Sequence, residues 1–148
     1  MMSIEDFREL HARMTAEKPK LFELIAPDAP ASEERLGQVE HAIGAALPIS
    51  YKQFLAQFGG GSFGLVNVCS ADSEGDFYLP RKQEEARSYL PSGLIAVSDD
   101  FAGGLYVLKV KEDHAEEPLW YWNLDGGLRP TEFANVLEFV ARYAYKAA

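Results

Sequence analysis

Two runs of apolar residues at helical spacing lie between Ser32 and Gly61, on either side of a proline. Intervals of three and four residues place these side chains on one face of a helix, so the pattern predicts two amphipathic helices. Ser32 is a suitable N-cap for the first helix, and Gly44 follows it where a left-handed C-cap is expected. The second helix begins either with Pro48 in its first turn or with Ser50 as its cap. Neither helix can bury its apolar face alone, so we expect the two to pack against each other.

Three other segments have helix-forming patterns. Ser3 can cap a helix near the N-terminus, with Asp6 completing a capping box, and the Lys18-Pro19 pair should break or kink the chain after it. Apolar residues at helical spacing recur close to the C-terminus. The predicted helices outside the central pair are Ser3–Met14, Arg81–Tyr89 and a C-terminal helix that Thr131 caps.

Five segments are rich in residues that favour strands. Short connections join the last three, which favours an antiparallel meander. Leu105–Lys111 is apolar on both faces, so we expect it to be a central strand covered on both sides. Leu124–Pro130 has the composition of a turn-rich link. The sequence therefore predicts an α+β fold with helices packed on a mainly antiparallel sheet. The expected strands are Phe63–Cys69, Asp76–Leu79, Leu94–Ser98, Leu105–Lys111 and Leu119–Asn123.

The chain has 148 residues, of which 47% are hydrophobic, and this suits one folded domain. We expect residues 1–31 to form a helical extension of a domain that spans residues 32–140. The single cysteine, Cys69, excludes an intramolecular disulfide and is expected to be a buried core residue. The N-terminus lacks the pattern of a secretory signal, and no apolar run is long enough to span a bilayer. We therefore expect a cytoplasmic protein.

The formal net charge is −9. This charge repels nucleic-acid backbones and anionic lipids on average, so neither is an expected partner. It would attract a basic protein, although solubility alone would also account for it.

Two motifs that suggest ligand binding fail their context tests. The glycines of Gly59–Gly64 have the spacing G-x-G-x-x-G, but dinucleotide binding requires a strand before them and a helix after them. Here the predicted order is reversed, so a helix end followed by a turn is the preferred interpretation. Asp72, Glu74 and Asp76 alternate with other residues but lack the glycine and the distal glutamate of a calcium loop. We interpret them as a solvated loop.

Two acidic segments are candidates for function. Asp99 and Asp100 follow a predicted strand and could act as an acid–base pair if their pKa values were separated. No histidine or cysteine stands nearby in the sequence, which favours turn formation or partner contact. Glu112–Glu117, which includes His114, is predicted to be a loop between strands. It could hold a metal ion, but a solvated run of charge is the preferred interpretation.

The segment Trp120-Tyr121-Trp122 places its two tryptophans on one face of a strand and Tyr121 on the other. One face should belong to the core. The other could present an aromatic anchor to a partner, although core packing on both faces is the slightly better explanation.

The order of these features resembles the SUKH superfamily, which includes the Smi/Knr type of cell-wall-assembly regulators. The resemblance covers roughly residues 32–140, and Phe58 stands where that family often has asparagine before the glycines. The resembling residues are Ser32, Leu36, Glu40, Leu47-Pro48, Tyr51, Phe54, Leu55 and Gly59-Gly60, followed by Leu94–Asp100, Gly103–Leu108, Pro118–Trp122 and Thr131–Phe133.

This resemblance implies a non-enzymatic protein-binding domain. Bacterial SUKH proteins resemble immunity proteins, which neutralise a cognate toxin that is often a nuclease and frequently basic. The alternative is a regulatory or scaffold module that binds a cellular protein; the third possibility is a small hydrolase or metal enzyme that uses Asp99, Asp100 or His114. No catalytic, cofactor-binding or metal-binding residue is predicted, and the sequence does not indicate an oligomeric state. The expected partner-binding residues are Asp99, Asp100, Glu112, Asp113, Glu116 and Glu117.

Overall fold

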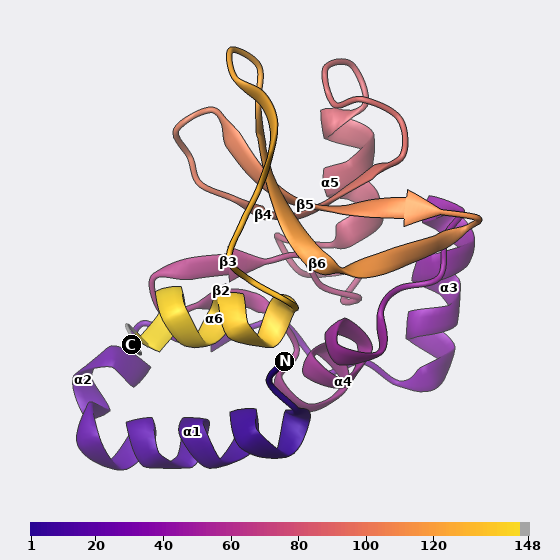
Figure 1. The fold of residues 1–148 in the computed structure, drawn as a ribbon. Coiled ribbons are helices and arrows are strands. Elements are labelled where there is room, and N and C mark those ends of the chain that lie inside the picture. The colour runs from indigo at the N-terminus through magenta and orange to yellow at the C-terminus, as the bar shows by residue number, and fades with distance from the viewer. Residues whose placement is uncertain (146–148) are drawn as a thin grey trace.

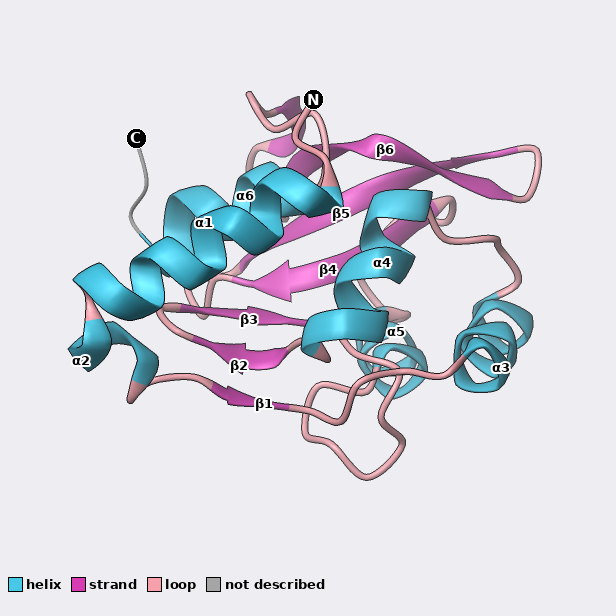
Figure 2. Cartoon of the chain, turned by 90° about the horizontal axis from the view of Figure 1, so that it is seen from below, coloured by secondary structure: helices cyan, strands magenta, loops and turns pink. Residues whose placement is uncertain are grey.

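The computed structural model describes residues 1–145 (Figure 1). Its strands form two antiparallel sheets, one in the order β1-β2-β3 and one in the order β4-β5-β6-β7. The helices α1, α4 and α6 lie on one side of the strands, and α5 lies on the other (Figures 1 and 2). The predicted fold class, α+β with mainly antiparallel strands, is confirmed. The first sheet consists of β1 (Ala26–Pro27), β2 (Gly61–Phe63) and β3 (Val66–Val68), and the second of β4 (Leu94–Asp99), β5 (Gly104–Lys111), β6 (His114–Asn123) and β7 (Gly127–Pro130).

The two central helices begin and end close to where the sequence predicts. Helix α3 spans Glu33–Ile43, and the Ser32 hydroxyl accepts a hydrogen bond of 3.2 Å from the Arg35 N–H. Gly44 ends this helix with φ of 74°. Helix α4 spans Ile49–Phe58 and starts directly after Pro48, without a side-chain cap. Ser50 is therefore not the cap.

Helices α3 and α4 meet through the Lys52–Glu40 ion pair at 3.5 Å, but α4 is not the main packing partner of α3, contrary to the expectation. Helix α3 packs mainly against α5 (Leu79–Ala86). The linker after α3 explains this, because it lies along the β5–β6 turn. The Ala46 N–H donates to the Asp113 carbonyl at 2.8 Å, and the Ala115 N–H donates to the Ala46 carbonyl at 2.8 Å. These bonds hold α3 near the end of the second sheet, and its apolar face is buried there.

The N-terminal helix α1 (Ile4–Glu17) has the predicted Ser3–Asp6 capping box. Lys18 ends it, and Pro19 begins the short helix α2 (Pro19–Phe22). Helix α1 packs against α4 and α6 (Val136–Tyr145). Aromatic rings fill this contact, and burying such rings is a large part of what stabilises a core. The rings that meet there come from Phe7, Phe54, Phe58, Phe63 and Tyr145, with His11 among them.

The region between α4 and β4 differs from the prediction in two ways. Phe63–Cys69 is not one strand, because β2 and β3 form a hairpin with Gly64 and Leu65 at its turn. Asp76–Leu79 is not a strand either. Helix α5 begins at Leu79, and Pro80 occupies its first turn, where proline is well tolerated.

The second sheet confirms the expected meander and the central position of β5. Leu105 and Val107 pack on the face beneath α5, whereas Leu108 belongs to the main core on the other face. Strand β6 begins earlier than predicted, at His114, because Glu112 and Asp113 alone form the turn with φ of 52° and 64°. Paired positive φ values of this kind suit a two-residue hairpin.

The C-terminal part holds two further corrections. Gly127–Pro130, predicted as a link, is strand β7 and pairs with residues 120–123 of β6. Helix α6 begins at Val136 rather than near Thr131. The Asn135 side chain accepts from the Glu138 N–H at 3.0 Å, as a cap does. The Thr131 hydroxyl instead donates to the Leu119 carbonyl at 2.6 Å.

Within residues 1–145, none of the helices is both long enough and apolar enough to cross a membrane.

Candidate partner-binding site

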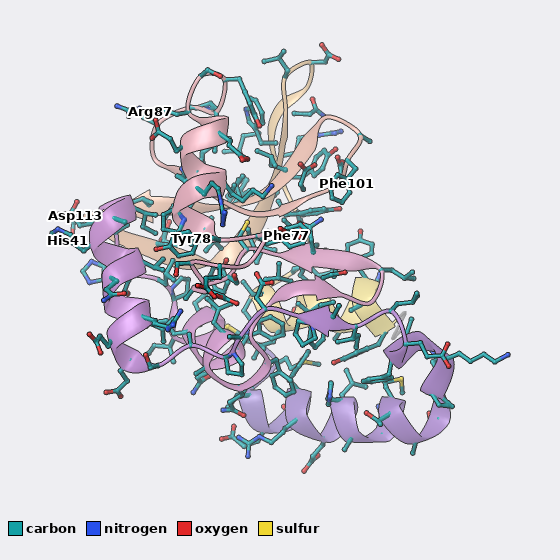
Figure 3. The ribbon with its side chains drawn as sticks, turned by 180° about the vertical axis from the view of Figure 1, so that it is seen from behind. His41, Phe77, Tyr78, Arg87, Phe101 and Asp113 are labelled. Carbon is teal, nitrogen blue, oxygen red and sulfur yellow. The ribbon has the colours of Figure 1, made fainter. Side chains whose placement is uncertain are left out.

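The six acidic residues predicted to bind a partner form two groups at opposite ends of β5. Asp99 and Asp100 lie at the β4–β5 turn, and Glu112 and Asp113 form the β5–β6 turn. Strand β5 has 8 residues, so the two turns are separated by about 25 Å along the strand. Asp113 and Phe101, which follows Asp100, stand at the two ends in Figure 3. The fold does not bring the two groups into one patch.

The group at the β5–β6 turn is only partly a loop. Glu112 and Asp113 are exposed in the turn, but Glu116 and Glu117 lie on β6, contrary to the prediction. Glu117 accepts a hydrogen bond of 2.5 Å from the Ser50 hydroxyl, so one of its oxygens is engaged within the chain. Among residues 1–145, no three His, Cys, Asp or Glu side chains gather as a metal site would require.

The group at the β4–β5 turn holds the turn in shape. Asp99 Oδ1 accepts from the Phe101 N–H at 2.7 Å. Asp100 Oδ1 accepts from the N–H groups of Ala102 and Gly104 at 2.8 and 2.9 Å. These are the side-chain-to-backbone bonds that acidic residues form in turns. Turn formation, one of the roles expected of the Asp99-Asp100 pair, is confirmed.

Tyr121 connects this turn to β6. Its hydroxyl donates to Asp100 Oδ2 at 2.5 Å. Burial disfavours the charged form of Asp100, but the hydrogen bonds from Tyr121, Ala102 and Gly104 outweigh it and lower the pKa below its ordinary value. Asp100 is therefore ionised at neutral pH. A general acid would need a raised pKa, so the environment of Asp100 does not favour that role.

Replacing Tyr121 with Phe is expected to raise the pKa of Asp100 and to lower the free energy of unfolding by about 1 kcal/mol at neutral pH. A lowered folded-state pKa stabilises the fold above the unfolded pKa, and this stabilisation is lost as the pH falls through the lowered value. The difference between Tyr121→Phe and the parent should therefore shrink in acid. Carbonyl-detected NMR titration and urea unfolding at several pH values measure both effects.

Tyr106→Phe is the matched control, because the Tyr106 hydroxyl faces Tyr143 at 3.5 Å and has no hydrogen bond to Asp100. An unchanged titration of Asp100 in Tyr121→Phe would contradict the assigned role of the Tyr121 hydroxyl.

Asn67 joins the two sheets beside this turn. Its side chain donates to the Asp99 carbonyl at 2.8 Å and accepts from the Asp99 N–H at 3.0 Å. The amide group thus takes the place of a backbone pair between β3 and β4. Asn67 is only 4% exposed. The apolar pattern did not identify Asn67 as important, and the available signal was a polar amide within an apolar strand.

An open groove of about 460 Å³ lies where the two sheets meet. It runs from the β2–β3 turn to the β4–β5 turn and reaches α6. We call it the Phe101 groove, and Figure 3 shows Phe77 and Phe101 on the same side of the molecule. Asp99 and Asp100 also line it. The apolar and aromatic side chains that line it are Leu65, Val66, Phe77, Phe101, Tyr106, Phe139 and Tyr143.

Several of these side chains are exposed although they are large and apolar. Phe101 is 77% exposed and Leu65 is 51% exposed. Phe101 also has φ of 57°, a conformation that is costly for an aromatic residue. The sequence analysis did not single out either residue, because periodicity identifies apolar positions that face a core and says little about apolar residues in turns.

The remaining candidates from the sequence, Cys69, Gly59–Gly64 and Asp72, have roles in the fold. Burial raises the pKa of the Cys69 thiol to about 12, so the prediction of a core cysteine is confirmed. Gly59–Gly64 follows helix α4 and leads into the β2–β3 hairpin, as the preferred interpretation expected. Asp72 accepts from the N–H groups of Ala29 and Glu74, and these bonds lower its pKa.

The aromatic segment of β6 packs on both faces. Trp122 is buried in the cluster beneath α5, and Trp120 is half-buried under the Lys109 ammonium group, which lies 3.6 Å from its ring centre. On the other face, Tyr121 contacts the ring of Tyr106. The segment itself does not project as an anchor, and among the described residues the most exposed aromatic side chain is Phe101.

The amino-acid sequence matches one protein-family model over most of its length. The model of the SMI1 / KNR4 family (SUKH-1) matches residues 30–142, which is more than half of the chain. The matched segment runs from the residues before α3 into α6, so it contains both sheets except β1, both acidic turns and most of the Phe101 groove. Such a domain is consistent with protein interaction. The chain belongs to the SMI1 / KNR4 family (SUKH-1).

Proposed function

We propose that this protein is a cytoplasmic, non-enzymatic binding domain that acts as an immunity protein and neutralises a cognate basic toxin. The observation that carries the proposal is the Phe101 groove. Apolar side chains are exposed there beside the carboxyl groups of Asp99 and Asp100, and such a surface suits binding of another protein. A buried free thiol at Cys69 suits a reducing compartment.

The acidic charge of the chain supports a basic partner. The net charge of −9 raises the rate of encounter with a positively charged protein and opposes nucleic acids. The exposed carboxylates of Asp99, Glu112, Asp113 and Glu116 contribute to this attraction at the two ends of β5. Asp100 and Glu117 add charge, but their oxygens are already hydrogen-bonded within the chain.

The test is co-expression with a toxin domain encoded beside the gene for this chain. Cells that express both proteins should survive, and the two should co-purify as a complex. Affinity should fall as the ionic strength rises, because salt screens exposed charges. A polynucleotide should not bind under the same conditions.

The proposal is wrong if the toxin remains lethal and unbound while this chain is expressed and folded. It also fails if no toxin gene lies nearby and no basic protein is captured from the native organism. Capture of a cellular protein that is not a toxin would indicate the regulatory alternative instead.

A further inference from the structure

We infer that the Phe101 groove binds a basic segment of the partner that presents one large apolar side chain between positively charged residues. The inference rests on the proposed function only for the identity of that partner. Asp99 and the walls of the groove make the contact, and the acidic group at the β5–β6 turn does not take part in it.

The apolar part of the occupant follows from the walls of the groove. Leu65, Phe101 and Tyr143 are exposed at its rim, and Phe77 and Tyr106 are half-buried along it. Covering these side chains removes apolar surface from water, which is the main favourable contribution to binding. A volume of about 460 Å³ is in the range of pockets that enclose small ligands, so it can hold one aromatic or long aliphatic side chain.

The position of Phe101 adds a second reason. Its ring is held out from the turn by a backbone at positive φ, and the Asp99 and Asp100 side chains fix that turn. A pre-formed turn costs little to order on binding, and rigid aromatic residues dominate the energy of many interfaces.

The polar group at the base of the groove is already paired. The Asn67 amide donates through one N–H and accepts through its oxygen, both on the backbone of Asp99. Its nitrogen and its oxygen therefore each keep a hydrogen bond within the chain when an apolar side chain covers them.

The charge of the occupant follows from the carboxylates. Asp99 is exposed and Asp100 is ionised, whereas no lysine, arginine or histidine among residues 1–145 lines the groove. Two basic groups in this region face aromatic rings. The Lys82 ammonium group lies 5.5 Å from the Phe77 ring centre, and the Arg129 guanidinium lies 5.6 Å from that of Tyr121. A positively charged segment therefore meets a complementary surface.

The first experiment measures the affinity of folded variants for the co-expressed toxin by calorimetry. Phe101→Ala should weaken binding by about tenfold or more, as loss of an interface anchor does. Ile49→Ala is its matched control, because Ile49 is 69% exposed on α4, away from the groove. Asp99→Asn should weaken binding several-fold and reduce its salt dependence. Glu17→Gln, at an exposed acid on α1 away from the groove, should change affinity little at physiological ionic strength.

The second experiment does not depend on the toxin. A short peptide with one phenylalanine between arginine and lysine residues is titrated into the isotope-labelled chain, and amide shifts are followed by NMR. Shifts should cluster at Leu65, at 99–104 and at Tyr143. Peptides with alanine in place of phenylalanine, or with glutamate in place of the basic residues, should bind more weakly.

The outcomes separate the two proposals. If the toxin binds and Phe101→Ala binds equally well, the groove assignment is wrong and the proposed function stands. If the toxin does not bind but the basic peptide shifts the groove residues, the groove assignment stands and the immunity role is lost. Peptide shifts confined to Glu112–Glu117, or no shifts up to millimolar peptide, overturn the groove assignment.

Discussion

Replacing Gly59 with Ala is expected to lower the free energy of unfolding by about 3 kcal/mol or more, a cost characteristic of residues with special backbone geometry in a packed site. Gly59 ends α4 with φ of 83°, in the left-handed region. A Cβ built there overlaps the carbonyl oxygen of Asp28. The segment that follows β1 would have to move away, and the bond from the Asp28 N–H to the Gly60 carbonyl, 3.0 Å long, would be strained or lost. Urea unfolding measures the change.

Gly44→Ala is the matched control. Gly44 ends α3 with φ of 74°, but a Cβ there would meet no heavy atom within 4 Å. This substitution carries the conformational cost alone, about 1 kcal/mol. Equal destabilisation of the two variants would show that the close approach of Asp28 to α4 is not important for stability.

Replacing Asn67 with Ala is expected to lower the free energy of unfolding by about 2 kcal/mol, because the buried side chain makes two hydrogen bonds that nothing else supplies. The loss should be local as well as global. The Asp99 N–H donates to Asn67, so its hydrogen exchange should accelerate more than that of the Cys69 N–H, which donates to Val97 at 2.7 Å. Urea unfolding and amide exchange measure the two effects.

Asn123→Ala serves as the control for Asn67→Ala. Asn123 also accepts from a backbone N–H, that of Gly126, but it does so in an exposed turn. Water can replace that bond, so the expected cost is below about 1 kcal/mol. Unchanged exchange at Asp99 in Asn67→Ala would contradict the role of Asn67 in joining the sheets. The basic peptide should also bind Asn67→Ala more weakly, because the junction of β3 and β4 forms the base of the groove.

The helix caps could be predicted because they depend on interactions between residues that are close in the sequence. Ser3 and Ser32 cap helices because a hydroxyl three residues before an N–H can reach it within the same turn. Gly44 ends α3 for an equally local reason, since it accepts a left-handed backbone. The apolar side chains on both faces of β5 were enough to place it centrally, because a strand covered on both sides cannot leave the N–H and C=O groups of its edges unpaired.

The elements that were missed depend on segments distant in the sequence. Residues 63–69 contain enough β-favouring residues for one strand, but the hairpin places β2 against β1 and β3 beside β4. Strand β7 contains glycine and proline and is a strand because residues 120–123 of β6 offer it a free edge. Helix α3 packs on α5 because the β5–β6 turn holds its linker.

For the candidate site, the sequence indicated the two acidic segments and the turn at Asp99-Asp100, and it placed Cys69 in the core. It did not indicate that these acidic segments lie at opposite ends of β5, that Phe101 and Leu65 border one groove, or that Asn67 joins the sheets beneath it.

The sequence by itself determined the caps at Ser3, Ser32 and Gly44, the acidic charge and the family of this protein, because each depends on neighbouring residues or on their order. Only the tertiary structure decided which surface we propose for a partner. The Phe101 groove exists because residues 65, 99–101 and 143 meet at the junction of two sheets. Contacts between residues so far apart in the chain depend on strand register and packing, which local patterns do not specify.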